Sequence, residues 1–469
     1  MRDLFFVAFL AGVMFMALRR PFLFTLCYCY VDIVAPQRLA FTLLANVQLS
    51  LFSFGLALLG WLIADNKKGT RFDWLQLVLI ALLGYCAITT VNADFPVEAA
   101  EKWSWVWKAL LWSIFLPIVL RTKLRIEALA LLMVLSAAAL AISGGVKTAM
   151  GGGGYGSLQL LLDDNSGLFE GSIFSTVAIA IIPLILWLAR HGTIFRPSRP
   201  VWIFAICLIL ACLLIPIGTQ ARTGLLCAVL LLALGLRDSE KRMTYIAAIA
   251  GVSLLALPLV PAAFSARMDT IANYQSDESA STRLAVWKWT WNFALEHPFG
   301  GGFDSYRQNE LQAVRVTVTN NGGQVTRTET PYTDKARAFH NAYFEMLGEQ
   351  GFPGLAMWLL LHITCIVRME KLRRRFRVAE PGKEWIRPLA TALQSAQLVY
   401  MLGSMFVGIA FQPFMYMVLA LQIALWTYVN RREKEARWRP IVHQTGVAKL
   451  APSTVPAAGF ASDATAGWR

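Results

Sequence analysis

The chain has 469 residues, of which 57% are hydrophobic and 15% are charged, and its mean hydropathy is +0.52. This composition excludes an ordinary soluble globular protein and predicts a polytopic membrane protein. The net charge of +14 comes from basic residues spread over short connectors, so we attribute it to membrane topology and expect no nucleic-acid partner.

Apolar runs close to the roughly 20 residues that a helix needs to cross a bilayer recur along the chain. The predicted spans are 40–64, 74–93, 103–120, 126–145, 171–190, 199–218, 222–236, 244–262, 353–368, 387–406 and 408–428. Two shorter runs, 4–18 and 21–35, predict either two tilted spans or one membrane hairpin. The expected fold class is therefore all-α, an integral membrane protein with about twelve transmembrane helices.

Charged residues predict how these spans are oriented. Connectors rich in Lys and Arg alternate with connectors that lack them, and the basic ones lie around Lys67, Arg121, Arg190, Arg237, 368–387 and 431–437. Because basic connectors stay in the cytoplasm, the loops 93–101, 146–170 and 263–339 are expected on the opposite side. The glycine run in the second of these loops predicts either a flexible linker or a loop that contacts sugar or phosphate.

Four regions follow from this pattern. Residues 1–262 are expected to hold the N-terminal transmembrane helices, and 263–339 form a large, helical periplasmic loop. Residues 340–429 hold the C-terminal transmembrane helices, and 430–469 form a cytoplasmic tail whose composition predicts disorder. A loop of this length is seldom a simple connector, so it is the expected place for chemistry.

Cysteine and histidine placement predicts neither disulfides nor a metal. All seven cysteines fall inside predicted spans, and the five histidines form no cluster with carboxylates at ligand spacing. We therefore expect no metal and no cofactor.

A polar break, Gly218-Thr-Gln-Ala-Arg-Thr-Gly224, separates two apolar runs. Arg222 opens the second run, where its side chain either extends to the lipid headgroups or binds an anion. Anion binding is plausible chemistry because a helix N-terminus offers unpaired N–H groups and a guanidinium group grips phosphate with two hydrogen bonds. Gln220 and Thr223 would add neutral donors.

The long loop contains Arg267 and then a predicted amphipathic helix over 281–296 that includes Arg283. Trp287 and Trp291 share a face of this helix at i, i+4, either as anchors at the membrane surface or as platforms for sugar rings. The helix is expected to stop at His297-Pro298, before a glycine-rich turn.

The loop ends in Arg337-Ala-Phe-His-Asn341, and the spacing predicts a helix over roughly 335–350 that Gly351 and Pro353 terminate. On that helix His340, Tyr343 and Leu347 would share one face, with Asn341, Glu345 and Glu349 on another. His340 is either a packing residue or, at a membrane lip beside several arginines, a group that accepts a hydroxyl proton near pH 7.

These elements together resemble the O-antigen ligase and polymerase superfamily of bacterial inner-membrane glycan transferases. The resemblance rests on the order of Gln220-Ala-Arg222-Thr-Gly224, the run from Arg283 to Gly300, and His340-Asn341 ahead of Glu349-x-Gly351-x-x-Gly354. The N-terminal Met1-Arg-Asp-Leu-Phe-Phe6 and Leu18-Arg-Arg-Pro-Phe22 are also similar to exosortase-associated O-glycosylation ligases.

The resemblance implies a GT-C-like fold and transfer of a glycan from undecaprenyl pyrophosphate to a hydroxyl of lipid A-core, at the periplasmic face of the inner membrane. Such transfer needs neither metal nor nucleotide sugar, and direct attack inverts the anomeric configuration. His340 is the expected catalytic base. The expected pyrophosphate ligands are Arg222, Arg283 and Arg267, supported by Gln220, Thr223, Asn341 and Tyr343.

Other readings stay open at this point. A polymerase would join repeat units to one another, and an O-oligosaccharyltransferase would glycosylate protein or exopolysaccharide. A lipid-linked glycan transporter belongs to a different class, and Asp32 is the clear acid inside a predicted span that such a protein would need. The long loop that carries several arginines favours an enzyme.

Overall fold

A computed structural model describes residues 2–40, 42–44, 47–67, 69–150, 170–237, 243–244, 278–321, 324–378 and 380–437. The helices of the first half are α1 (Arg2–Arg19), α2 (Phe22–Val34), α3 (Pro36–Leu39), α4 (Leu49–Ala64), α5 (Trp74–Val91), α6 (Pro96–Val119) and α7 (Lys123–Ala149). The helices of the second half are α8 (Gly171–His191), α9 (Arg199–Gly218), α10 (Arg222–Leu236), α13 (Glu278–Glu296), α14 (Ala342–Arg375), α15 (Ile386–Gly403) and α16 (Pro413–Arg437).

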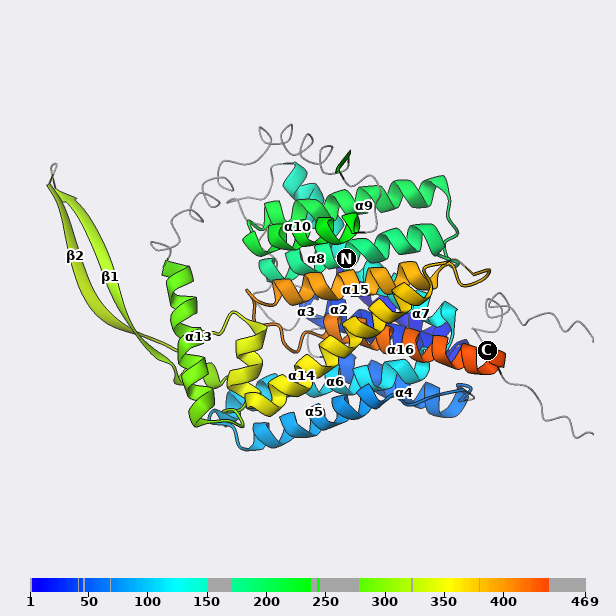
Figure 1. The fold of residues 1–469 in the computed structure, drawn as a ribbon, viewed down its shortest axis with the longest axis horizontal. Helices are drawn as coiled ribbons and strands as arrows, with labels where there is room; N and C mark the ends of the chain where they lie inside the picture. Colours follow the sequence, from blue (N-terminus) through cyan, green and yellow to red (C-terminus); the bar gives the residue numbers. More distant parts are fainter. Residues whose placement is uncertain are drawn as a thin grey trace, which may run out of the picture.

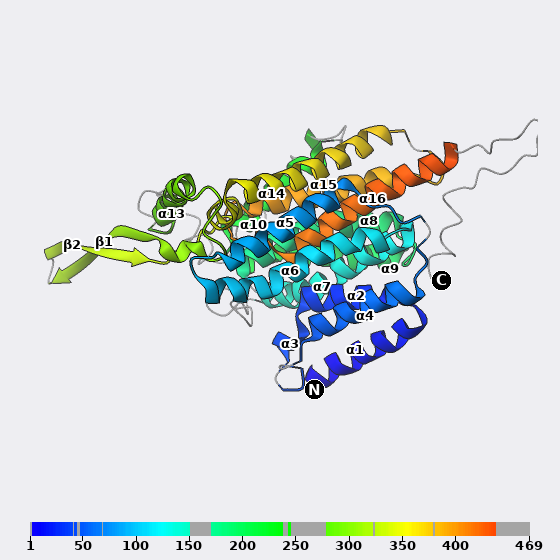
Figure 2. The same ribbon diagram turned by 90° about the horizontal axis from the view of Figure 1, so that it is seen from below.

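The long helices pack side by side as one bundle, with α1, α2 and α4 along one flank (Figure 1, Figure 2). Within the described residues, α5, α7, α8, α9, α14 and α16 are long and apolar enough to cross a membrane, and α2, α4 and α10 are shorter apolar helices. The prediction of a multi-pass helical membrane protein is confirmed. The number of about twelve spans stays a prediction, and the predicted span 244–262 lies outside the described residues.

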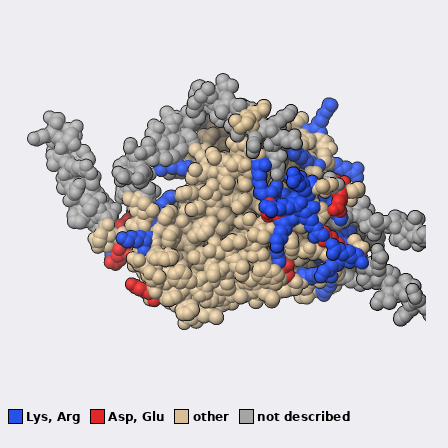
Figure 3. All heavy atoms as spheres, viewed as in Figure 1, with Lys and Arg blue, Asp and Glu red and all other residues tan. Residues whose placement is uncertain are grey.

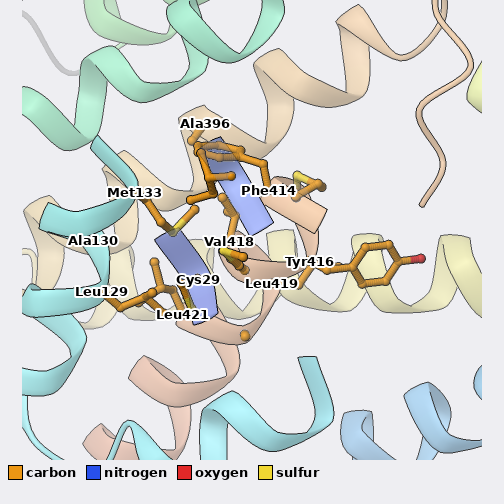
Figure 4. Close-up of a cluster of buried hydrophobic side chains, with 14 of the residues drawn as sticks. Cys29, Leu129, Ala130, Met133, Ala396, Phe414, Tyr416, Val418, Leu419 and Leu421 are labelled. Atoms are coloured by element: carbon orange, nitrogen blue, oxygen red, sulfur yellow. The ribbon is translucent and has the colours of Figure 1, made fainter. Parts of the chain in front are cut away.

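The core of the bundle lies around α8 and α16, whose apolar windows are each 83% buried. Figure 4 shows Met133 of α7 and Val418 and Leu421 of α16 in one cluster with Cys29 of α2. A helix that is apolar on all sides belongs in such an interior position. Small residues bring neighbours close, since a Cβ on Gly145 of α7 would lie 2.8 Å from the Cα of Ala211 on α9.

The two ends of the bundle differ in charge. We call one the basic end, because Arg121, Arg125, Arg237, Arg368 and the last turn of α14 lie there, and Figure 3 shows Lys and Arg gathered over it. Buried ion pairs connect the helices at the basic end, including Arg125 to Asp65 at 2.7 Å and Arg368 to Asp73 at 2.9 Å. The basic connectors and the long loop therefore lie at opposite ends of the bundle, as their sequence pattern predicts.

The opposite end carries α13 and a β-hairpin, and we call it the hairpin end. Strand β1 (Glu310–Asn321) pairs antiparallel with β2 (Gln324–Lys335), and the ribbon extends away from the bundle (Figure 2). The prediction of a helical loop is wrong at this ribbon, while the chain as a whole remains consistent with an all-α membrane protein. Valine and threonine dominate β1, and β-branched residues favour a pleated strand over a helix.

Candidate functional site

A cavity of about 700 Å³ opens at the hairpin end of the bundle. Segments far apart in the sequence form its wall: the first part of α6, the start of α8, one residue of α13, the segment after α13, the end of the segment before α14, the first turns of α14 and the segment before α16. The residues that line it are Glu98, Glu101, Lys102, Trp105, Glu170, Ser172, Arg283, Asp304, Tyr306, Arg307, Ala338, Phe339, His340, Glu345, Glu349, 406–409, Phe411 and Gln412.

His340 lines this cavity from an irregular segment and not from a helix. Its φ is 46°, in the left-handed region, and the helix α14 begins two residues later. The cause is Asn341, whose side-chain oxygen accepts hydrogen bonds from the backbone N–H groups of Tyr343 and Phe344 at 2.8 and 3.2 Å and so caps the helix. The predicted helix start near 335 is wrong, and so is the predicted helical face shared by His340, Tyr343 and Leu347.

Trp287 fixes the segment before His340. Its indole N–H donates to the carbonyl oxygen of Phe339 at 2.9 Å, and its ring stacks on Phe344 with centroids 5.4 Å apart. Trp287 therefore packs against protein, and the two roles predicted for the tryptophan pair stay predictions. Trp291 remains half exposed on the other part of α13.

The sequence prediction of a helix break at Gly351 is confirmed. Gly351 has φ 63° and ψ −167°, so α14 changes direction there. The glycine-rich turn lies against this kink: the N–H of Gly301 donates to Gly348 and that of Gly302 to Glu349, both at 3.0 Å. A Cβ on Gly300 would lie 2.5 Å from the Glu349 carbonyl oxygen, so only glycine permits this approach.

The electrostatic surroundings of His340 are mostly cationic. Partial burial lowers the pKa of His340, the positive charges of Arg283 and Arg337 lower it further, and Glu170 acts in the opposite sense. The imidazole is therefore neutral near pH 7 and able to accept a proton.

The far wall of the cavity holds a lysine that the sequence analysis did not single out. Nζ of Lys102 on α6 lies 2.7 Å from a carboxylate oxygen of both Glu345 and Glu349 on α14, and 3.9 Å from Asp304. Burial raises the pKa of Asp304, against the opposing charges of Lys102 and Arg307. The partners of Lys102 are more than 200 residues away, so the sequence offered only a cation at the start of a predicted span.

The polar break from Gly218 to Gly224 lies at the same end of the bundle but outside the cavity lining. Arg222 is the first residue of α10, as predicted. Thr219 shares a 2.7 Å hydrogen bond with Ser175, which places this turn against the start of α8, whose neighbours Glu170 and Ser172 line the cavity.

Several predicted supporting residues have structural partners. Gln220 and Thr223 are buried, Asn341 caps α14, and the Tyr343 hydroxyl donates to the Met401 carbonyl oxygen at 3.1 Å. Arg267 lies outside the described residues. The structure thus brings Arg283 and His340 together in one cavity and places Arg222 nearby at the same end.

Backbone strain concentrates at this end. Of the five non-glycine residues with positive φ in the described part of the chain, Asp304 and His340 line the cavity, Ala336 precedes it and Gln220 lies in the polar break. Strained backbone of this kind gathers at functional sites. Across the same described ranges, no group of three or more His, Cys, Asp or Glu residues is arranged to hold a metal ion.

Comparison with known families finds a match in the central part of the chain. Residues 206–359 match the family model described as O-Antigen ligase. This part of the chain is similar to the O-antigen ligase family, and we refer to residues 206–359 as the O-antigen ligase domain. The domain contains Arg222, Arg283 and His340, and its family supports ligase- or polymerase-type activity on glycans, as the resemblance predicted.

The rest of the chain is matched differently. Residues 1–193 match a family of unknown function (DUF5935), and no functionally curated protein matches the sequence. This N-terminal region supplies Glu98, Glu101, Lys102, Glu170 and the aromatic Trp105 to the cavity, so the O-antigen ligase domain forms only part of the wall.

Proposed function

We propose that the protein transfers a glycan from undecaprenyl pyrophosphate to an acceptor hydroxyl, with lipid A-core as the first acceptor to test, and that the cavity at the hairpin end is the active site. The observation that carries the proposal is the presence of His340 and Arg283 in one cavity, both from the O-antigen ligase domain.

The donor would place its diphosphate on the arginine side of the cavity. Cleavage of a glycosyl–diphosphate bond adds negative charge to the leaving group, and fixed guanidinium groups stabilise such charge. Arg283 lines the cavity and is proposed as a direct ligand. Arg222 at the start of α10 and Arg267 are proposed as further ligands, since the positive end of the α10 dipole adds to the charge of Arg222.

The acceptor would lose its proton to His340. The acceptor oxygen forms a bond to the anomeric carbon, the bond from that carbon to the diphosphate oxygen breaks, and undecaprenyl pyrophosphate leaves. The hydroxyl proton passes to the neutral imidazole of His340, whose lowered pKa keeps it unprotonated near pH 7. A single attack from the face opposite the leaving group inverts the anomeric centre.

The basic end of the bundle supports an orientation in which this cavity faces the periplasm of a bacterial inner membrane, because basic ends stay in the cytoplasm. A polyprenyl chain would then reach the cavity from the lipid while the glycan stays in water.

The test is transfer of a lipid-linked glycan to lipid A-core by the purified protein in detergent. Arg283→Ala is expected to lower kcat/KM at least about a hundredfold, because it removes charge stabilisation from the transition state. Lys288→Ala is the matched control, since Lys288 is an exposed cation on the same helix outside the cavity lining. Equal losses in both variants would contradict the assignment. Parallel reactions with excess donor or with an acceptor protein distinguish a polymerase or an O-oligosaccharyltransferase.

A further inference from the structure

The cavity is divided into two halves of opposite charge. Arg283, Arg337 and the carboxylate of Glu170 lie close enough to His340 to act on its charge. Lys102, Arg307, Glu98 and Glu345 lie close to the Asp304 carboxylate, and Glu349 contacts the Asp304 backbone. Each half thus has its own set of charged neighbours, and His340 belongs to the cationic one.

The second half is acidic even when its cations are counted. Five carboxylates of the described residues line it, Glu98, Glu101, Asp304, Glu345 and Glu349, against the two cations Lys102 and Arg307. Lys102 is engaged at 2.7 Å by both Glu345 and Glu349. Arg307 lies at the longer distances of 3.7 Å from Glu98 and 3.9 Å from Asp304.

A buried glutamate, Glu349, holds the partly exposed Asp304 in place. Oε1 of Glu349, whose side chain is fully buried, accepts the backbone N–H of Asp304 at 3.0 Å. This bond keeps Asp304 at φ 59°, and the Asp304 carboxylate lines the cavity. Trp105 and Tyr306 add aromatic surface to the same half.

Part of this acidic half comes from outside the O-antigen ligase domain, including two of its five carboxylates. Glu98, Glu101, Lys102 and Trp105 belong to α6 in the N-terminal region, and all four line the cavity. The N-terminal region, residues 1–193, therefore forms one wall of the cavity.

We propose that this acidic half is the acceptor subsite, that it takes a terminal sugar without phosphate or carboxylate groups, and that the N-terminal region contributes to this specificity through Glu98 and Glu101. The inference rests on the proposed function. Carboxylates accept strong hydrogen bonds from sugar hydroxyls and from an ammonium group, and aromatic rings pack on sugar faces. An anionic acceptor would meet more carboxylates than cations, and like charges placed together across an interface weaken binding. The anionic diphosphate of the donor is attracted to the opposite half of the cavity, because the arginines there are positively charged.

The test compares three soluble acceptors that differ only in charge: an alkyl glucoside, the corresponding alkyl 2-amino-2-deoxyglucoside and the corresponding alkyl glucoside 6-phosphate. Transfer of labelled glycan gives KM for each, and direct titration gives each Kd without turnover. We expect the phosphorylated acceptor to bind at least about tenfold more weakly than the neutral one, and the amino sugar to bind at least as well as the neutral one.

The double variant Glu98→Gln, Asp304→Asn removes two negative charges from the acceptor half. Asparagine tolerates the left-handed conformation of Asp304, so the fold is preserved. The ratio of the phosphorylated to the neutral Kd is expected to fall several-fold. Glu310→Gln is the control, because this exposed carboxylate on β1 lies outside the cavity lining and pairs with Lys335; its ratio should equal that of the wild type.

Equal binding of neutral and phosphorylated acceptors, or a ratio unchanged in the double variant, overturns the inference. Failure of the proposed function is separate, because it means no transfer to any acceptor, lipid A-core included, while the binding order of the three glycosides still tests the acidic subsite.

Discussion

Nζ of Lys102 lies 2.7 Å from Oε1 of Glu349, and this contact joins the N-terminal region to the O-antigen ligase domain inside the cavity wall. Glu345 takes a second contact from the same ammonium group at 2.7 Å. Lys102→Met would leave two buried carboxylates without their cation, and loss of one partner of a buried ion pair costs about 3–5 kcal/mol. We therefore expect a large drop in thermal stability in detergent.

A second substitution tests the cause of that drop. Glu349→Gln in the Lys102→Met background removes one of the stranded charges, so part of the lost stability should return. If the double variant is less stable than Lys102→Met, the buried charge is not the cause.

The glycine contact at the kink of α14 gives a steric prediction. A Cβ on Gly351 would lie 2.2 Å from the carbonyl oxygen of Pro298, at a positive φ. Gly351→Ala should destabilise the protein by about 3 kcal/mol or more and lower transfer, because the kink positions Glu345 and Glu349. Gly84→Ala is the matched control, since its Cβ meets nothing within 4 Å in the helix α5 and alanine favours a helix. Chemical unfolding of both variants measures the difference.

The pKa of His340 gives a pH prediction. Burial, Arg283 and Arg337 lower this pKa below the ordinary histidine value of about 6.5, so the fall of kcat/KM with acidification should have its midpoint below about pH 6.5. Glu170→Gln removes a charge that favours the protonated imidazole and should move the acid limb to lower pH. Arg337→Gln removes a charge that opposes protonation and should move it to higher pH. Shifts in the same direction would exclude His340 as the titrating group.

The hydrogen bond from Trp287 to Phe339 predicts a positioning effect. Trp287→Phe keeps an aromatic ring on Phe344 but removes the donor, which should cost about 1 kcal/mol of stability and lower kcat more than it raises KM for the donor. Steady-state kinetics in detergent separate the two. A rise in KM alone would show that the indole does not position His340.

The sequence predicted the features that depend on local pattern. Apolar runs located most helices, and Gly351 marked the kink, because hydrophobic length and a missing Cβ act locally. The β-hairpin was missed although valine and threonine alternate along β1. The predicted start of α14 was too early. The side chain of Asn341 caps the helix, so His340 lies before its first turn.

The arrangement of charges in the cavity could not be predicted from short stretches of sequence. Lys102 meets Glu345 and Glu349 across more than 200 residues of chain, and only the packing of α6 against the neighbouring helices brings them together. The separation of cationic and acidic halves depends on the same long-range packing. Sequence motifs identified Arg283 and His340 as candidates but not the acids that face them.

The most direct test of the central claim compares His340→Ala with His297→Ala in the transfer of lipid-linked glycan to lipid A-core, with EDTA present. His297 is exposed, stacks on Phe293 and lies outside the cavity lining, so it controls for loss of a histidine as such. The account predicts product from the wild type and His297→Ala and none above background from His340→Ala, with all three proteins equally folded. Near-normal product from His340→Ala would contradict it.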